Sequence, residues 1–407
     1  MIEPDVRSLS PSVSENRVAC VSLSWLDTWL TEHTDELIAV RRQLHAHPEL
    51  SFGENETTAL LAAKLRQAGL DPQILPSGTG LTCEVGTGTR LVGFRGDLDA
   101  LPLRDLKDVP YRSTVDGVCH ACGHDAHATI ALGVALALAS APELPGRVRL
   151  IFQPAEEAMP GGAAAALRAG AADDLERVFA LHCDPRLECG KVGLLAGPIT
   201  AAADSVEVTL RGPGGHTARP HLTVDLVDAL ARIVVGVPGL LSRQVDPRDG
   251  LSLVWAAIGA GIAHNTIPER GQLRGTVRVL RRDAWDGAEK LVRGLIEQVV
   301  APTGAEIEVH YQRGVPPVVN DSGCIEMLRA GVTEALGADG VTRTEQSLGA
   351  EDFGWYSDYA PIALARLGTA IEGRQLDLHQ GSFDIDERAL AIGVRVATHT
   401  LLAALTA

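Results

Sequence analysis

Segments of strand character and helix character alternate through the first half of the chain. A first helix, capped by Ser24, is predicted from apolar positions at helical spacing, namely Leu26, Leu30, His33, Leu37, Val40 and Leu44. A second helix is expected from about Asn55 to a stop at Gly69. Strands are predicted at 81–85, 91–95, 148–152 and 178–182, with helices after His127 and Gly162. Such alternation favours an α/β fold in which helices flank both faces of a mainly parallel sheet.

The pattern changes near Ala201, where apolar and polar residues begin to alternate one by one. Val206, Val208 and Leu210 are separated by polar residues, as in a half-buried strand. Helices at about 224–235 and 284–300 and strands at about 251–258, 273–280 and 307–311 follow. We therefore expect a smaller α+β domain at 203–312, inserted into a larger domain formed by 23–202 and 313–407. Residues 1–22 are expected to be a flexible tail.

The charge balance argues against nucleic-acid and membrane partners. The sequence has 36 Lys and Arg against 52 Asp and Glu, a net charge of −16, so its average field repels phosphate backbones and anionic lipids. The longest apolar stretch, 126–141, is too short to span a bilayer. The N-terminal segment lacks the features of a secretory signal, and seven scattered cysteines do not form a disulfide framework. These features predict a cytoplasmic protein with reduced thiols.

The densest group of potential metal ligands lies at 119–127, with the sequence CHACGHDAH. Thiolate and imidazole are common ligands of zinc and related metals. Cys119 and Cys122 could instead form a redox pair, or the segment could be a structural loop. A four-cysteine zinc site would need a second CxxC, and haem attachment would need His where Gly123 stands. Metal binding is the leading hypothesis, with the redox pair and the structural loop left open.

Carboxylates and histidines near later strand ends extend this group. Glu156 and Glu157 follow the strand predicted at 148–152, and two adjacent carboxylates can divide the tasks of metal ligand and general base. His182 ends another apolar strand, and His379 comes shortly before the last helix. Each of them alone is more often a solvated or core residue. Because open α/β sheets place ligands at strand ends, the whole set predicts a site for two ions.

The order of these motifs resembles that of the aminoacylase and carboxypeptidase superfamily of two-metal hydrolases, specifically its hippurate hydrolase and auxin-conjugate hydrolase branch. The resemblance covers nearly everything after residue 24. It rests on RRQLHAHPEL at 41–50, RGDLDALP at 95–102, HACGHDAH at 120–127, QPAEE at 153–157, GGHTARPH at 214–221, HNTIP at 264–268 and GAEDF at 349–353. So many motifs in the same order make coincidence improbable.

The resemblance implies a metal centre with a defined set of ligands. They are Cys122, His124, Glu157, His182 and His379, with Glu156 left unligated as the catalytic base. The centre would hold two divalent ions, and a thiolate shared between them is chemically reasonable. Cys, His and Glu together suit zinc, manganese, cobalt or nickel, so the metal is left open.

Three acidic residues are expected to support these ligands. The wider superfamily has a His-x-Asp ligand pair where this chain has Arg95-Gly96-Asp97, and Arg has no lone pair to donate. Asp97 is therefore expected to orient a ligand histidine, or else to be a turn carboxylate. Glu351 and Asp352, on a Gly-rich loop, either support ligands or cap a helix.

The resemblance also assigns roles to the inserted domain, as a lid and dimerisation unit of a homodimer. His216 would stabilise the tetrahedral oxyanion, in its own or a neighbouring subunit. Asn265 would hold the carboxylate of an amino-acid product, and Arg278 could pair with that carboxylate in a fork. An Arg on an edge strand is, however, usually solvated.

The sequence thus predicts a metal-dependent amidohydrolase that cleaves an N-acyl amino acid, or a related small amide, into a carboxylate and an amine. One alternative is a dipeptidase or carboxypeptidase, which uses the same chemistry. Another is a metal- or metabolite-binding protein without catalysis, against which the intact Glu156 argues. Cys119 replaces a methionine that is common in this branch, and Cys183 replaces an aliphatic residue. These two substitutions affect the expected substrate specificity more than the expected hydrolysis. No motif reports the acyl group, the amino-acid side chain or the stereochemistry.

Overall fold

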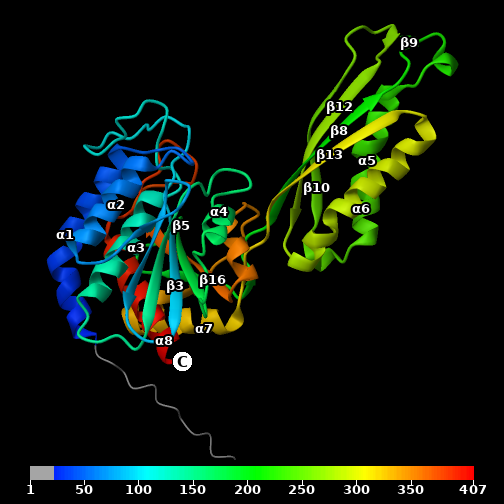
Figure 1. Ribbon diagram of the computed structural model, residues 1–407. Coiled ribbons are helices and arrows are strands. Elements are labelled where there is room, and N and C mark those ends of the chain that lie inside the picture. Colours follow the sequence, from blue (N-terminus) through cyan, green and yellow to red (C-terminus); the bar gives the residue numbers. More distant parts are fainter. Residues whose placement is uncertain (1–22) are drawn as a thin grey trace, which may run out of the picture.

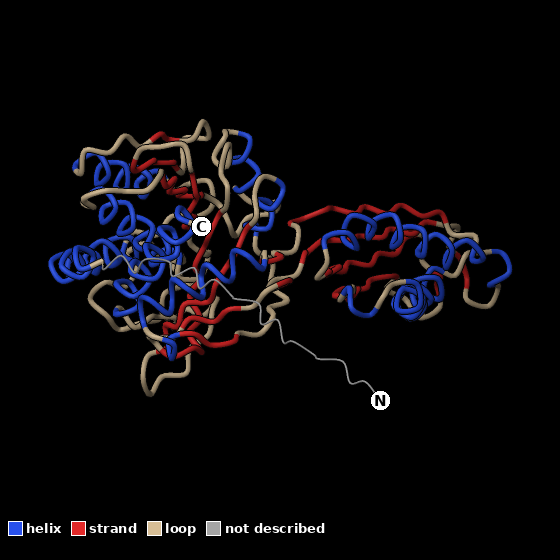
Figure 2. Tube along the Cα trace, turned by 90° about the horizontal axis from the view of Figure 1, so that it is seen from below, coloured by secondary structure: helices blue, strands red, loops and turns tan. Residues whose placement is uncertain are grey.

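A computed structural model describes residues 23–407 and shows two bodies joined by extended strands (Figure 1). The larger α/β body contains the beginning and the end of the described chain. The smaller α+β body extends away from it, as a second view also shows (Figure 2). The tail predicted at 1–22 lies outside the described residues. The fold class expected from the sequence is therefore confirmed, including the separate smaller sheet.

The larger body is built on an eight-stranded sheet with the order β1-β2-β4-β3-β5-β16-β6-β15. Its strands are β1 (Gln73–Ile74), β2 (Leu81–Gly86), β3 (Leu91–Asp97), β4 (Arg147–Gln153), β5 (Val178–Glu188), β6 (Val192–Leu194), β15 (Val341–Arg343) and β16 (Ile362–Ala370). The four central neighbours β4, β3, β5 and β16 run parallel, whereas β2 pairs antiparallel with β4, and β6 with β16. The carboxyl ends of the four central strands therefore lie at one edge.

Helices cover both faces of this sheet. They are α1 (Ser24–Ala46), α2 (Asn55–Gln67), α3 (His124–Ala139), α4 (Ala163–Arg168), α7 (Ser322–Leu336) and α8 (Arg388–Thr406). On one face α1, α3, α7 and α8 pack together over side chains such as Phe94 and Leu150. On the other face α4 and the 3-10 segment η5 (Asp352–Asp358) cover Ile151 and Leu364. Because both faces are covered, every residue of β3 is buried.

The first and the last helix of the larger body are α1 and α8. The N-cap of α1 is Leu23, whose carbonyl oxygen accepts a hydrogen bond from the amide of Leu26 at 2.8 Å. The predicted Ser24 cap is therefore wrong, because Ser24 already lies in the first turn. Helix α8 is long and apolar enough to cross a membrane by length and composition, but its apolar residues are largely buried against α3 and α7.

The smaller body, called the lid below, has a four-stranded antiparallel sheet with the order β10-β12-β8-β13. Its elements are β8 (Ala202–Arg211), α5 (Leu226–Gln244), β10 (Ser252–Ala260), β12 (Arg270–Val279), α6 (Arg282–Val300) and β13 (Glu306–Val315). Helices α5 and α6 enclose a core of their own with the sheet. Strands β8 and β13 reach slightly beyond the predicted boundaries at 203 and 312, because they also form the connection to the larger body.

Helix α5 is longer than the sequence pattern predicted. The prediction ended it near Val235, whereas it continues through Pro238 to Gln244. Proline removes one helical hydrogen bond, but Ile233, Val237 and Leu241 keep the helical spacing and are buried in the lid core. Burial of this apolar face outweighs the local cost of the proline.

A buried carboxylate holds the connection between the two bodies. Asp204, near the start of β8, accepts hydrogen bonds from Trp285 Nε1 at 2.9 Å, from the Tyr311 hydroxyl at 2.6 Å and from the Gly314 amide at 2.9 Å. Trp285 in turn packs edge-on against Trp355 of η5, with ring centroids 5.8 Å apart. Asp204 thereby ties β8, α6 and β13 together at the base of the lid.

Removal of this carboxylate should destabilise the lid. Asp204→Ala leaves buried donors without an acceptor, so the free energy of unfolding should fall by about 3 kcal/mol or more. Urea unfolding followed by tryptophan fluorescence measures the change. The matched control is Asp228→Ala, since Asp228 is exposed and paired only with Arg232 on the surface of α5. Equal unfolding midpoints for the two variants would contradict the role of Asp204.

Candidate metal centre

The five predicted ligands converge at the carboxyl ends of the parallel strands. Cys122 and His124 lie at the start of α3, Glu157 follows β4, His182 is in β5, and His379 follows β16. Gly123, between the first two, has a φ of +94°, and a Cβ there would lie 3.0 Å from the sulfur of Cys183. Only glycine fits this turn, which directs Cys122 and His124 into the same site.

One group of ligand atoms is formed by Cys122, His124 and His182, all buried and all within 4.8 Å of one another. The Cys122 sulfur lies 3.6 Å from His182 Nε2. His182 Nδ1 donates a hydrogen bond to the Cys183 carbonyl at 2.8 Å, which fixes the proton on Nδ1 and leaves the Nε2 lone pair facing the sulfur. Burial lowers the pKa of His182 well below its ordinary value, which favours this neutral form.

A second group is formed by Cys122, Glu157 and His379, whose ligand atoms also lie within 4.8 Å of one another. His379 Nε2 is 3.2 Å from Glu157 Oε1. The backbone of His379 has a φ of +58°, an unfavourable value for a residue with a side chain, and its amide donates to the Ala121 carbonyl at 2.8 Å. Cys122 belongs to both groups, so its sulfur could contribute a ligand to either of them.

Asp99, which the sequence reasoning did not single out, aligns two of the predicted ligands and the predicted base. His124 Nδ1 donates to the Asp99 backbone carbonyl at 2.9 Å and lies 3.2 Å from its carboxylate. The same carboxylate accepts hydrogen bonds from the amides of Glu156 and Glu157 at 2.9 and 3.0 Å. The only available signal was its place in the RGDLDALP segment, two residues after Asp97.

Asp97 contacts a histidine that was not predicted as a ligand. Its carboxylate lies 2.6 Å from His127 Nδ1, whereas His124 Nε2 is 3.7 Å away. Asp97 also accepts from Arg95 Nη1 at 2.5 Å. The carboxylate that orients the ligand His124 through Nδ1 is therefore that of Asp99, while Asp97 aligns His127.

Arg95 links this strand end to the Gly-rich loop. Its Nη2 donates to Glu351 at 2.9 Å and to Asp352 at 2.8 Å, and all of these side chains are buried. Glu351 also accepts from the Phe353 amide, and Asp352 from the Ala163 amide at the start of α4. Both expected roles, support of the site and helix capping, are thus combined in the same two residues.

Glu156 lies beside the ligand cluster. Its carboxylate is 3.9 Å from His124 Nε2, and 9% of its side chain is exposed. Burial raises the pKa of Glu156 well above its ordinary value, and repulsion from Glu351 and Asp352 raises it further. A carboxyl with a raised pKa is suited to accept and release a proton near neutrality.

The donor set fits divalent transition metals. His124 Nε2 is buried without a hydrogen-bond partner in the described chain, and it lies 4.0 Å from Glu157 Oε1, which contacts His379 Nε2 at 3.2 Å. Polar atoms are seldom left in this state, and here they face the Cys122 sulfur. Burial raises the pKa of the Cys119 thiol to about 11, the opposite of what a redox CxxC requires. The geometry therefore favours a metal centre over a redox pair.

The three predicted lid residues do not reach this cluster within one chain. His216 is exposed on β9 (Gly215–His216), at the tip of the lid far from β3 and β5 (Figure 1). Asn265 precedes β11 (Thr266–Ile267), which pairs with β9. Arg278 lies at the opposite end of β12, where it donates to the Leu348 carbonyl. The chain does not bring Asn265 and Arg278 together in a fork.

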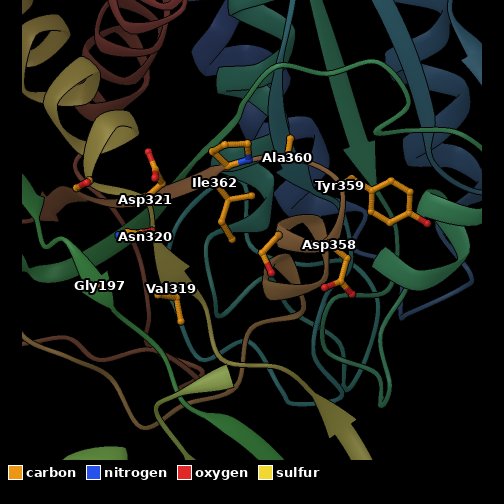
Figure 3. Close-up of a pocket in the computed structure, with 11 residues that line it drawn as sticks. Gly197, Val319, Asn320, Asp321, Asp358, Tyr359, Ala360 and Ile362 are labelled. Atoms are coloured by element: carbon orange, nitrogen blue, oxygen red, sulfur yellow. The ribbon is translucent and has the colours of Figure 1, made fainter. Parts of the chain in front are cut away.

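A pocket of about 710 Å³ lies elsewhere, at the start of β16 (Figure 3). It contains none of the predicted site residues. Its acidic groups already have partners, since Asp321 caps α7 and Asp358 pairs with Arg282 of the lid. The pocket is therefore separate from the metal centre.

Comparison with known proteins identifies relatives along most of the chain. The putative glutamate–cysteine ligase 2-3 of Rhodococcus jostii is 48% identical over 90% of this chain, which spans only 47% of that protein's length. The N-acetylcysteine deacetylase of Bacillus subtilis is 34% identical, covering 88% of this chain and 94% of the relative. Thermostable carboxypeptidase 2 of Saccharolobus solfataricus is 34% identical, covering 91% of this chain and 95% of the relative.

A solved structure has the same fold as this chain in both the larger body and the lid. The crystal structure of a dinuclear metal-binding M20 peptidase from Bacillus subtilis superimposes with a TM-score of 0.81 at 30% identity, covering 92% of this chain and 99% of that one. Residues 93–403 match the model of peptidase family M20/M25/M40. This chain therefore belongs to the M20 family of metallohydrolases, in its amidohydrolase branch.

Proposed function

We propose that this protein hydrolyses the amide bond of N-acyl amino acids with two divalent ions. The observation that carries the proposal is the pair of ligand groups that share Cys122, with Glu156 beside them. Divalent ions bound there lower the pKa of water and polarise an amide carbonyl. The first group would hold one ion and the second group the other.

Glu156 performs the proton transfers in this proposal. Its carboxylate accepts a proton from the attacking water and returns it to the nitrogen of the departing amine, so no net proton is consumed at Glu156. The amides of Glu156 and Glu157 both donate to Asp99, which anchors the backbone that carries the two carboxylates. In this proposal Glu156 transfers the proton and Glu157 holds metal.

The relatives support a deacylase activity for this protein and also suggest a second candidate function. The N-acetylcysteine deacetylase is named for removal of an acyl group from an amino acid, which matches the proposed substrate class. The equally identical carboxypeptidase favours a peptide substrate as the second candidate. Turnover of N-acetyl amino acids without turnover of dipeptides or N-blocked peptides would separate the two.

The lid supports a homodimer that completes the site. Strand β10 is an edge strand of the lid sheet, and Val254 and Ile258 on it are exposed. An open apolar edge favours pairing with another copy. A second copy would supply His216 to the site, since His216 lies far from Glu156 in its own chain.

Replacement of the shared thiol should remove both ions. Cys122→Ser should lower metal content from about two ions per chain to less than one, because a hydroxyl is a far weaker ligand than a thiolate. His182→Ala and His379→Ala should each lose about one ion, since each belongs to one group. Elemental analysis after dialysis measures the content, and Cys189→Ser, outside the cluster, is the control. Loss of only one ion in Cys122→Ser would contradict the bridging position.

Replacement of the proposed base should separate binding from catalysis. Glu156→Gln keeps the ligands, so metal content should stay at the wild-type level, while kcat for an N-acetyl amino acid falls at least about 100-fold. Amine release measures turnover. Glu143→Gln, on the surface, should retain full activity. Undiminished turnover in Glu156→Gln would exclude the role of Glu156.

A mixing experiment tests the contribution of His216 from a second copy. Glu156→Gln and His216→Ala should each be inactive alone. After subunit exchange, mixed dimers contain one intact site, so an equimolar mixture should recover about a quarter of wild-type activity. No recovery, with exchange verified by mass-tagged subunits, would place His216 in its own subunit or outside the mechanism.

A further inference from the structure

Arg366, in the middle of β16, is a buried arginine beside the metal centre without a protein partner. Only 9% of its surface is exposed. Within residues 23–407 it makes no hydrogen bond or ion pair, although nearly every other buried arginine and lysine does. The guanidinium nitrogens of Arg366 are not among the fully enclosed polar atoms without a hydrogen-bond partner. Part of the exposed surface of Arg366 therefore belongs to its guanidinium.

The strand register places this guanidinium on the side of the sheet that carries the site. Arg366 on β16 is the direct partner of His182 on the parallel strand β5. Side chains alternate between faces, so Ala365 and Leu367 enter the first core with α3 and α8, whereas Arg366 shares the opposite face with His182. On its other side Gly193 of β6 has no side chain, and a Cβ there would lie 3.4 Å from the Cβ of Arg366.

The nearest acidic side chains are already committed to other donors. Glu351 accepts from Arg95 Nη2 and from the Phe353 amide. Asp184 accepts from the amide of Arg186 at 2.9 Å. Glu351 and Asp184, the two acids that interact electrostatically with Arg366, thus belong to other hydrogen-bond networks, and neither contacts Arg366 directly.

A largely buried charge without a direct protein partner is unfavourable, and a bound anion would supply the missing partner. Guanidinium binds carboxylates with two parallel hydrogen bonds, a geometry that a planar anion on a small substrate matches. The site already contains an excess of protein carboxylates, which would repel a substrate anion elsewhere in it. Arg366 is the position where a carboxylate is favoured.

We propose that Arg366 binds the carboxylate of the substrate, on the amino-acid half of the scissile amide. This assignment rests on the proposed function for the identity of the substrate, but its recognition chemistry is independent of turnover. It differs from the sequence-based expectation, which gave this task to Asn265 and Arg278 of the lid. Arg278 instead donates to the Leu348 carbonyl at the base of the lid.

Binding by the metal-loaded Glu156→Gln protein tests the proposal without catalysis. Isothermal titration compares N-acetyl-L-methionine with N-acetyl-L-methioninamide, which lacks the carboxylate. A third probe, N-succinyl-L-methioninamide, moves the carboxylate to the acyl half. Adding Arg366→Met should weaken binding of N-acetyl-L-methionine by about 10- to 100-fold and leave the affinity for the amide within about twofold. Arg366→Lys should restore part of the loss.

Matched variants separate this role from a structural one. Arg343→Met removes an exposed arginine from the neighbouring strand β15 and should change none of the affinities. Metal content and the melting temperature of each variant verify that the site is intact. If Arg366→Met weakened the binding of both N-acetyl probes equally, the proposal would be overturned. It would also be overturned if only Arg278→Met weakened the binding of N-acetyl-L-methionine.

The outcomes also distinguish this proposal from the proposed function. A loss confined to the succinyl probe would overturn the assignment to the amino-acid half. Equal affinity of the parent protein for N-acetyl-L-methionine and its amide would overturn carboxylate recognition altogether. If the wild-type protein bound the carboxylate through Arg366 but hydrolysed no N-acyl amino acid, the proposed function would fail and the binding site would stand.

Discussion

The buried carboxylate of Asp99 holds His124 and the backbone of Glu156 and Glu157 in place at the predicted metal centre. It joins the loop after β3 to His124 at the start of α3 and to the amides of Glu156 and Glu157 after β4. The hydroxyl of Ser51 donates to the same group at 2.7 Å. Segments from distant parts of the sequence are therefore held by a single acceptor. Hydrogen bonds of this kind fix ring orientation and the tautomer of a ligand histidine.

The sequence was sufficient for the catalytic body because its signals are local. Period-two and helical spacings located the strands and helices, and the strand ends at which Cys, His and Glu recur predicted which side chains lie together. Asp99 and Arg366 were missed for a physical reason. Asp99 acts through contacts between segments that are far apart in sequence, and Arg366 lies in an apolar strand where only the register with β5 shows that it adjoins His182.

The lid was harder to interpret for the same reason. The core of the lid follows from local spacing, but the length of α5 does not. A local rule predicted that α5 ends before Pro238, whereas burial of Leu241 extends the helix beyond it. The sequence identified the motifs at His216 and Asn265, but it did not predict how far these residues lie from the larger body. A motif reports which residues recur together, whereas the distance between them in the folded chain depends on contacts that no motif contains.

Charge explains why two arginines lie so close to a centre that binds cations. The buried and half-buried acids around the site are Asp97, Asp99, Glu156, Glu157, Glu351 and Asp352. Arg95 neutralises part of this charge by contacts with Asp97, Glu351 and Asp352. The remaining acids leave an excess of negative charge that divalent metal ions would offset. Arg366 contributes nothing to that internal balance through direct contact, and this is why its charge is available to an incoming anion rather than to the fold.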